Sequence, residues 1–209
     1  MKKDNFNKFS VPLGLLDYIN PIFYTITIMT IIKNISLESP FNIIMIIGAV
    51  LSIVFGFVIP TGKVIVGLGI IEFKMPVSLV FLVNLGILLS GLMLFKFVLN
   101  LKLVLLLTIS LIILLLLIVI YNKSKKINTI AVLTGAFGYL LIYSSLIILS
   151  IRKSNLLPTL FYLIAIILFV MLCGIGIKAN LKDPKVHWKI EISNVICQGL
   201  VALGTIILF

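Results

Sequence analysis

Long apolar runs separated by short charged segments make up most of the chain. Seven such runs lie at about 11–32, 41–58, 76–98, 103–121, 127–151, 156–177 and 188–209. Each is close to the roughly 20 apolar residues that a helix needs to cross the hydrocarbon core of a bilayer. Because lipid offers no hydrogen-bond partner to the backbone, spans of this kind are helical. The pattern therefore predicts an all-α, polytopic membrane protein: seven transmembrane helices in a single domain covering 1–209.

The first run is the least regular, because Asp17, Asn20 and Pro21 interrupt its apolar residues. A proline inside a helix removes a backbone donor and kinks or breaks the helix. Two interpretations stay open. The run is either one kinked span or an interfacial helix through Tyr18 followed by a shorter span, which would leave six full spans plus a broken first helix. No small-x-small cleavage site follows this run, so we expect it to be retained rather than removed as a signal peptide.

The segment 61–74 differs from the other connections, because it contains two short β-branched runs around Gly67-Leu68-Gly69. This composition favours a small β-hairpin or plug at the membrane surface. A hydrophobic loop lying on the lipid headgroups is the alternative. In either case we expect the second span to end near Val58.

The composition supports the membrane assignment. Hydrophobic residues make up 62% of the chain and charged residues 11%, with a mean hydropathy of +1.33. Soluble domains carry roughly 25% charged residues. The formal net charge of +11 does not indicate nucleic-acid binding, because the basic residues lie between apolar runs without a continuous basic face or aromatic stacking platform.

The distribution of Lys and Arg predicts the orientation. With the N-terminus inside, the outer segments hold five of the 17 basic residues, and the remaining twelve are cytoplasmic; the outer five are Lys33, Lys96, Lys102, Arg152 and Lys153. Positive charge concentrates on the cytoplasmic side of multi-pass proteins. We therefore expect an N-in, C-out arrangement in a bacterial-type cell membrane.

The last run carries the main candidate site. His187, Glu191, Asn194 and Gln198 recur at steps of four, three and four, which places them on one face of a helix. A carboxylate at the centre of a membrane helix costs about 2.5–3.5 kcal/mol on insertion scales, and less near an end. We therefore interpret the stripe as the lining of a binding site, with Glu191 as its charged member.

A second polar face lies on the first run, where Asp17, Asn20 and Tyr24 follow at helical spacing. If the first and last helices are neighbours, Asp17 and Glu191 lie at a similar depth and share a cavity. Asn84 in the third run is a further candidate ligand. The structural alternative is that these amides bridge helices, with hydroxyl partners such as Tyr143 on the fifth run.

Small residues indicate where helices pack closely. Gly48, Ser52 and Gly56 are spaced four apart in the second run, and Ala131 and Gly135 repeat the spacing in the fifth. Such positions let helix backbones approach each other in lipid. We assign them to packing rather than to chemistry.

The chain lacks the sequence motifs of several enzyme classes. The chain has one His, so HExxH zinc chemistry is excluded, and it contains no GxSxG, P-loop or GxGxxG motif. Cys173 and Cys197 lie inside predicted spans without CxxC spacing, and we expect them to pack as small hydrophobic residues. The sequence predicts no cofactor and no metal site.

The favoured hypothesis is a small multi-pass transport or channel protein. Its cytoplasm-facing polar cavity, between the first and last helices, would bind a cation, a proton or a small polar solute. It would function alone, as a homo-oligomer or in a larger membrane complex. One alternative is a non-catalytic membrane subunit or sensor. The other, an intramembrane lipid-modifying enzyme, is disfavoured by the missing nucleophile motifs.

Overall fold

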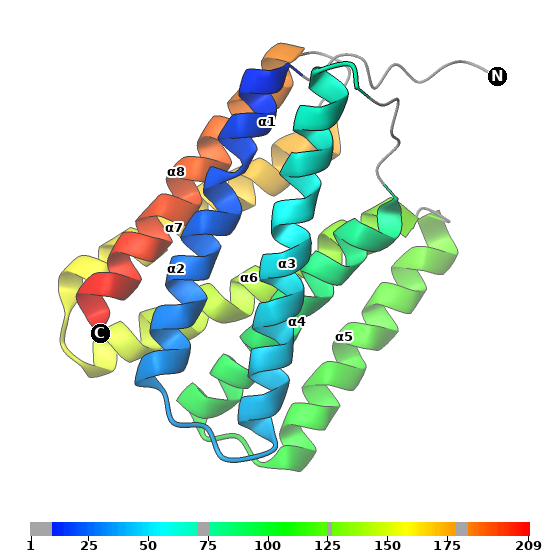
Figure 1. The fold of residues 1–209 in the computed structure, drawn as a ribbon. Helices are drawn as coiled ribbons and strands as arrows, with labels where there is room; N and C mark the ends of the chain where they lie inside the picture. The colour runs from blue at the N-terminus through cyan, green and yellow to red at the C-terminus, as the bar shows by residue number, and fades with distance from the viewer. Residues whose placement is uncertain (1–9, 71–75, 125–126, 179–183) are drawn as a thin grey trace.

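A computed structural model describes residues 10–70, 76–124, 127–178 and 184–209, and all regular secondary structure in these ranges is α-helical (Figure 1). The helices in this part of the chain are α1 (Val11–Asp17), α2 (Ile19–Asn34), α3 (Phe41–Gly67), α4 (Val77–Leu99), α5 (Leu103–Ser124), α6 (Ile127–Arg152), α7 (Leu156–Lys178) and α8 (Pro184–Leu208). They form a bundle in which consecutive helices run in opposite directions, apart from α1 and α2.

The helices have the length and composition of membrane spans. Within the described ranges, six stretches are long and apolar enough to cross a bilayer: Val11–Asn34, Phe41–Gly67, Val77–Leu99, Thr129–Arg152, Leu156–Cys173 and Lys185–Leu208. The fourth predicted span corresponds to α5, a further helix of 22 residues. The fold is thus that of an all-α, multi-pass membrane protein, as expected.

The first span is broken, and the break lies where the sequence placed it. Tyr18 alone separates α1 from α2, and the chain continues through it as one membrane-length stretch. Pro21, four residues after Asp17, has no N–H to offer the Asp17 carbonyl. This lost hydrogen bond accounts for the end of α1 at Asp17.

The prediction for segment 61–74 was wrong over residues 61–67. Helix α3 does not end near Val58 but continues through Pro60 to Gly67, and residues 71–75 lie outside the described ranges. Proline is tolerated inside membrane helices where neighbouring groups compensate for its missing donor. Here Pro60 is buried, so packing against neighbouring groups supports the helix at this position.

Small residues bring the central helices together, as their spacing predicted. The most extensive packing is between α4 and α6, followed by α3 against α4. A Cβ atom on Gly86 of α4 would lie 2.5 Å from the Gly48 carbonyl oxygen and from Ser52 Oγ of α3. Helix α5 has few contacts with the bundle and stands to one side of it in Figure 1.

At one end of the bundle, basic side chains bind helix C-termini and aromatic rings. Arg152 donates to the Val98 carbonyl of α4 at 2.5 Å, and Lys153 donates to the Leu208 carbonyl of α8 at 3.0 Å. The ammonium nitrogen of Lys96 lies 4.0 Å from the centre of the Phe41 ring. Cations are favourable at helix C-termini because the terminal carbonyls lack intrahelical donors.

Candidate functional site

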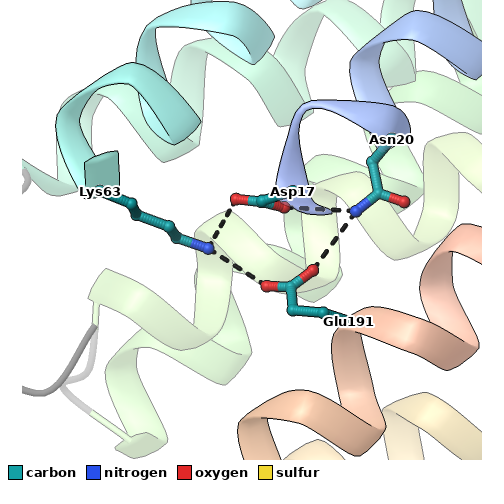
Figure 2. A network of polar contacts seen from close by, with 4 residues as sticks. All are labelled: Asp17, Asn20, Lys63 and Glu191. Carbon is teal, nitrogen blue, oxygen red and sulfur yellow. Dashed lines mark hydrogen bonds and ion pairs between the residues drawn. The ribbon is translucent and has the colours of Figure 1, made fainter. Parts of the chain in front are cut away.

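At the other end of the bundle, four polar side chains from three parts of the chain form a closed ring of contacts (Figure 2). Lys63 Nζ lies 2.6 Å from Asp17 Oδ2 and 3.1 Å from Glu191 Oε1. The side-chain amide of Asn20 donates to Asp17 Oδ1 at 3.2 Å and to Glu191 Oε2 at 3.3 Å. We call this set of four residues the charged cluster.

The break between α1 and α2 positions the acidic side of the cluster. Asp17 is the last residue of α1 and Asn20 lies in the first turn of α2, so the break brings them together. Glu191 comes from α8, which packs against both α1 and α2. The expected proximity of the first and last helices is confirmed.

The end of α3 brings Lys63 to the two acids. Gly14 of α1 packs against this end, since a Cβ on it would lie 3.1 Å from the Val64 backbone nitrogen. Tyr18 and Thr61 hydroxyls are 2.6 Å apart, and because Thr61 donates to a carbonyl of its own helix, Tyr18 is the donor between them. These contacts fix the end of α3 against α1.

The cluster is largely removed from solvent. The side chains of Lys63, Asp17 and Glu191 expose 17%, 13% and 12% of their surface. Two carboxylates share one ammonium group, and the neutral Asn20 amide gives each acid one further hydrogen bond. When both acids are ionised, these side chains carry one excess negative charge. An uncompensated charge is costly in a medium of low polarity.

A cavity of about 130 Å³ lies directly inward from the cluster. Its walls come from α1, α2, α3, α4 and α6, and the lining residues are Asp17, Asn20, Pro21, Tyr24, Ser52, Gly56, Ile59, Val83, Ile87 and Tyr139. The polar face Asp17–Asn20–Tyr24 therefore borders a cavity. The expected cavity was between the first and last helices, whereas this one lies between the first helix pair and α3, α4 and α6.

Two polar atoms at this cavity lack partners. Asn20 Oδ1 and the Tyr24 hydroxyl oxygen are buried and form no hydrogen bond of standard geometry with the described residues, although the Ser52 and Ser90 hydroxyls lie near the Tyr24 hydroxyl. Tyr24 as a whole is only 5% exposed. Buried polar groups are normally hydrogen-bonded, so these two atoms mark the polar end of the cavity.

Gln198, the deepest residue of the predicted stripe, lies away from the cluster in a separate buried chain of hydrogen bonds. Its amide donates to the Tyr143 hydroxyl of α6 at 3.1 Å, and Gln198 is 2% exposed. The Tyr143 hydroxyl is 3.8 Å from Cys197 Sγ, which in turn donates to the Ala165 carbonyl of α7. The chain links α8 to α6 and α7, as the structural alternative for the amides predicted.

The remaining predicted ligands are also separate from the cluster. Asn194 is partly buried on α8, and no hydrogen bond joins it to a described residue. Asn84 of α4 packs against Gly135 of α6. His187 lies in the first turns of α8, where it is partly buried and in contact with neighbouring groups. Of the seven predicted ligands, the structure thus joins Asp17, Asn20 and Glu191.

Sequence reasoning missed Lys63, which lies in the segment 61–74 that was expected to form a hairpin, a plug or a loop at the membrane surface. A spacing signal was nevertheless present, because the series Gly48, Ser52, Gly56, Ile59 and Lys63 has steps of four, four, three and four. These steps keep to one face of a helix. The apparent breakers Pro60 and Gly62 hid the continuation of this face.

Both cysteines are free, and within the described ranges no group of three or more His, Cys, Asp or Glu side chains is placed to hold a metal ion. The fold and the charged cluster together define a helical multi-pass membrane protein with a buried ionic site. Comparison with protein-family models, curated proteins and solved structures finds no match for this chain.

Proposed function

We propose that this protein is a small transport or channel protein of the cell membrane, and that the charged cluster is its ion-handling site. The transported species would be a cation, a proton or a small polar solute. Glu191 and Asp17 would bind the incoming positive charge, while Lys63 holds the site in its resting state. The sharing of one lysine by two largely buried carboxylates is the observation that supports this proposal most directly.

The excess negative charge of the cluster would favour binding of a proton or a cation. Ionisable residues among membrane helices are costly, and they commonly mark ion or proton pathways. If the two acids and Lys63 formed only a structural link, one acid and one base would be sufficient. The second acid leaves room for one more positive charge, which a proton or a cation would supply in competition with Lys63.

The neighbouring cavity supports a path rather than an isolated ion pair. It begins at Asp17 and Asn20 and extends inward to Tyr24 and Tyr139. A cavity of about 130 Å³ is several times the roughly 30 Å³ that one water molecule occupies in the liquid. A charge released from the cluster would therefore enter a space already provided with polar atoms.

The proposed topology has seven spans, with the N-terminus inside and the end of α8 outside. The cluster then lies near the cytoplasmic surface, at the end of the bundle where α1 and α8 begin. Three of the five basic residues assigned to the outer side, Lys96, Arg152 and Lys153, bind carbonyl groups or rings at the opposite end. Their positions thus have a structural reason that does not conflict with the positive-inside rule.

The test is ion flux in proteoliposomes that contain the purified full chain. Glu191→Gln keeps the shape and hydrogen-bonding capacity of the side chain but removes its charge, so flux should fall at least tenfold while the protein stays folded. Glu38→Gln, in the exposed segment between α2 and α3, is the matched control and should leave flux unchanged. Normal flux in Glu191→Gln would refute the role of the cluster.

A second candidate, a non-catalytic subunit of a larger membrane complex, is favoured by the position of α5. An apolar groove of about 530 Å³ lies between α4, α5 and α6. A partner helix seated there would give α5 the packing that the bundle itself provides only sparingly. Co-purification of one defined membrane protein, lost on Leu117→Asp in this groove, would support this candidate.

A further inference from the structure

The cavity beside the charged cluster has features that restrict what it can bind. We call it the tyrosine chamber, after Tyr24 and Tyr139 in its wall. The side-chain oxygen of Asn20 is buried there without a donor, while the amide nitrogen of the same residue is fully used by the two acids. A carbonyl oxygen can only accept hydrogen bonds. A ligand in the chamber must therefore be a hydrogen-bond donor.

The adjoining cluster adds a requirement for charge. Asp17 belongs both to the cluster and to the chamber wall, so when both acids are ionised the one excess negative charge of the cluster acts directly on the chamber. Water would satisfy Asn20 and Tyr24 but would leave that charge in place. A donor that carries one positive charge satisfies both requirements.

The volume of the chamber accommodates a small cation. The chamber measures about 130 Å³, which is enough for ammonium or a short primary amine. The rings of Tyr24 and Tyr139 lie 6.4 Å apart at 89°, with the edge of one ring toward the face of the other. Within this wall a cation that carries N–H groups supplies the donor that Asn20 Oδ1 needs.

We propose that the tyrosine chamber binds a small monovalent cation with N–H donors, of the ammonium or methylammonium type, between Asn20 Oδ1 and the Tyr24 hydroxyl. This inference deepens the proposed function, on which it rests, by naming the class of ion. Its positive charge balances the second acid of the cluster. Its N–H groups supply the donor that Asn20 Oδ1 lacks and a further hydrogen bond to the Tyr24 hydroxyl.

The experiment is calorimetric titration of the full chain in lipid nanodiscs at constant ionic strength. The probes are ammonium, methylammonium, tetramethylammonium and sodium chloride. Ammonium and methylammonium should bind, whereas tetramethylammonium, which has no N–H donor, and sodium should bind at least tenfold more weakly. Tyr24→Phe removes one hydroxyl and keeps the ring, so it should weaken ammonium binding about tenfold, as expected for a hydrogen bond to a charged group.

Tyr162→Phe is the matched control. Its hydroxyl is bonded to Thr205, between α7 and α8 and outside the chamber, so the variant should bind ammonium like the unmodified protein. Thermal unfolding of both variants shows that they are folded. Absence of ammonium binding, equal binding of sodium, or unchanged binding in folded Tyr24→Phe would each overturn the inference.

The same measurements separate this inference from the proposed function. Proton flux that depends on Glu191, without ammonium binding, would overturn the inference that the chamber binds ammonium and would leave the transport role intact. Ammonium binding that depends on Tyr24, in a protein without flux, would support the chamber and refute transport.

Discussion

The ammonium nitrogen of Lys63 lies 2.6 Å from Asp17 Oδ2, which joins the end of α3 to the end of α1. Removal of this one base leaves two buried acids facing each other. We therefore expect Lys63→Met to lower the free energy of unfolding by about 3–5 kcal/mol, the usual cost of breaking a buried ion pair from one side. Unfolding by SDS in mixed micelles measures this change.

Two comparisons make the Lys63 prediction specific. Lys189→Met, on the exposed side of α8 near the same end of the bundle, should have little effect. The triple variant Asp17→Asn/Lys63→Met/Glu191→Gln carries no charge in the cluster and should recover much of the lost stability. Equal stability of Lys63→Met and the unmodified protein would show that the ion pairs do not hold the helices together.

Gly86 tests the close approach of α3 and α4. An added methyl group would lie 2.5 Å from the Gly48 carbonyl oxygen, so Gly86→Ala forces the two backbones apart. We expect a loss of about 1–3 kcal/mol, as is usual for overpacking. Gly56→Ala is the milder comparison, because its Cβ would meet only Pro21 Cβ, at 3.3 Å. Similar effects of the two substitutions on thermal unfolding would contradict this interpretation.

Gln198 and Tyr143 test whether the deep end of the polar stripe is structural. A double-mutant cycle with Gln198→Leu and Tyr143→Phe should give a coupling energy of about 0.6 kcal/mol, and no more than about 1.7, the range measured for hydrogen bonds between membrane helices. Ion flux should persist in Gln198→Leu. Loss of flux with unchanged stability would instead place Gln198 on the transport path.

Cysteine labelling tests the proposed topology. Ser36, between α2 and α3, and Leu68, at the end of α3, are exposed at opposite ends of the bundle. In a background with Cys173 and Cys197 replaced by serine, a membrane-impermeant maleimide added to intact cells should label Ser36→Cys and not Leu68→Cys. Labelling of Leu68→Cys alone would reverse the orientation.

The sequence predicted the helical elements well, because a membrane helix needs a long apolar run and the runs are clearly separated. The end of α3 was the exception. Proline and glycine residues such as Pro60 and Gly62 commonly end helices in water, but inside a bundle the packing around the buried Pro60 supports the helix beyond it. Because α3 extends to Gly67, Lys63 lies on a helix and contacts the acids of the candidate site.

The polar stripe on α8 shows what periodicity alone cannot provide. The spacing correctly placed Glu191, Asn194 and Gln198 on related faces of one helix. The neighbours of that helix change along its length, however: Glu191 contacts α2 and α3, whereas Gln198 contacts α6. Spacing within one segment gives no information about this change, which depends on how the helices cross.

The basic residues at the end of the bundle opposite the charged cluster also affect the stability of the helix ends. Arg152 and Lys153 donate hydrogen bonds to carbonyl groups at the C-terminal ends of α4 and α8. Substitutions that remove these positive charges in order to invert the protein would also detach the helix ends that they secure. Such variants should therefore be less stable in whichever orientation they insert, and a charge-reversal experiment at these positions would change stability together with topology.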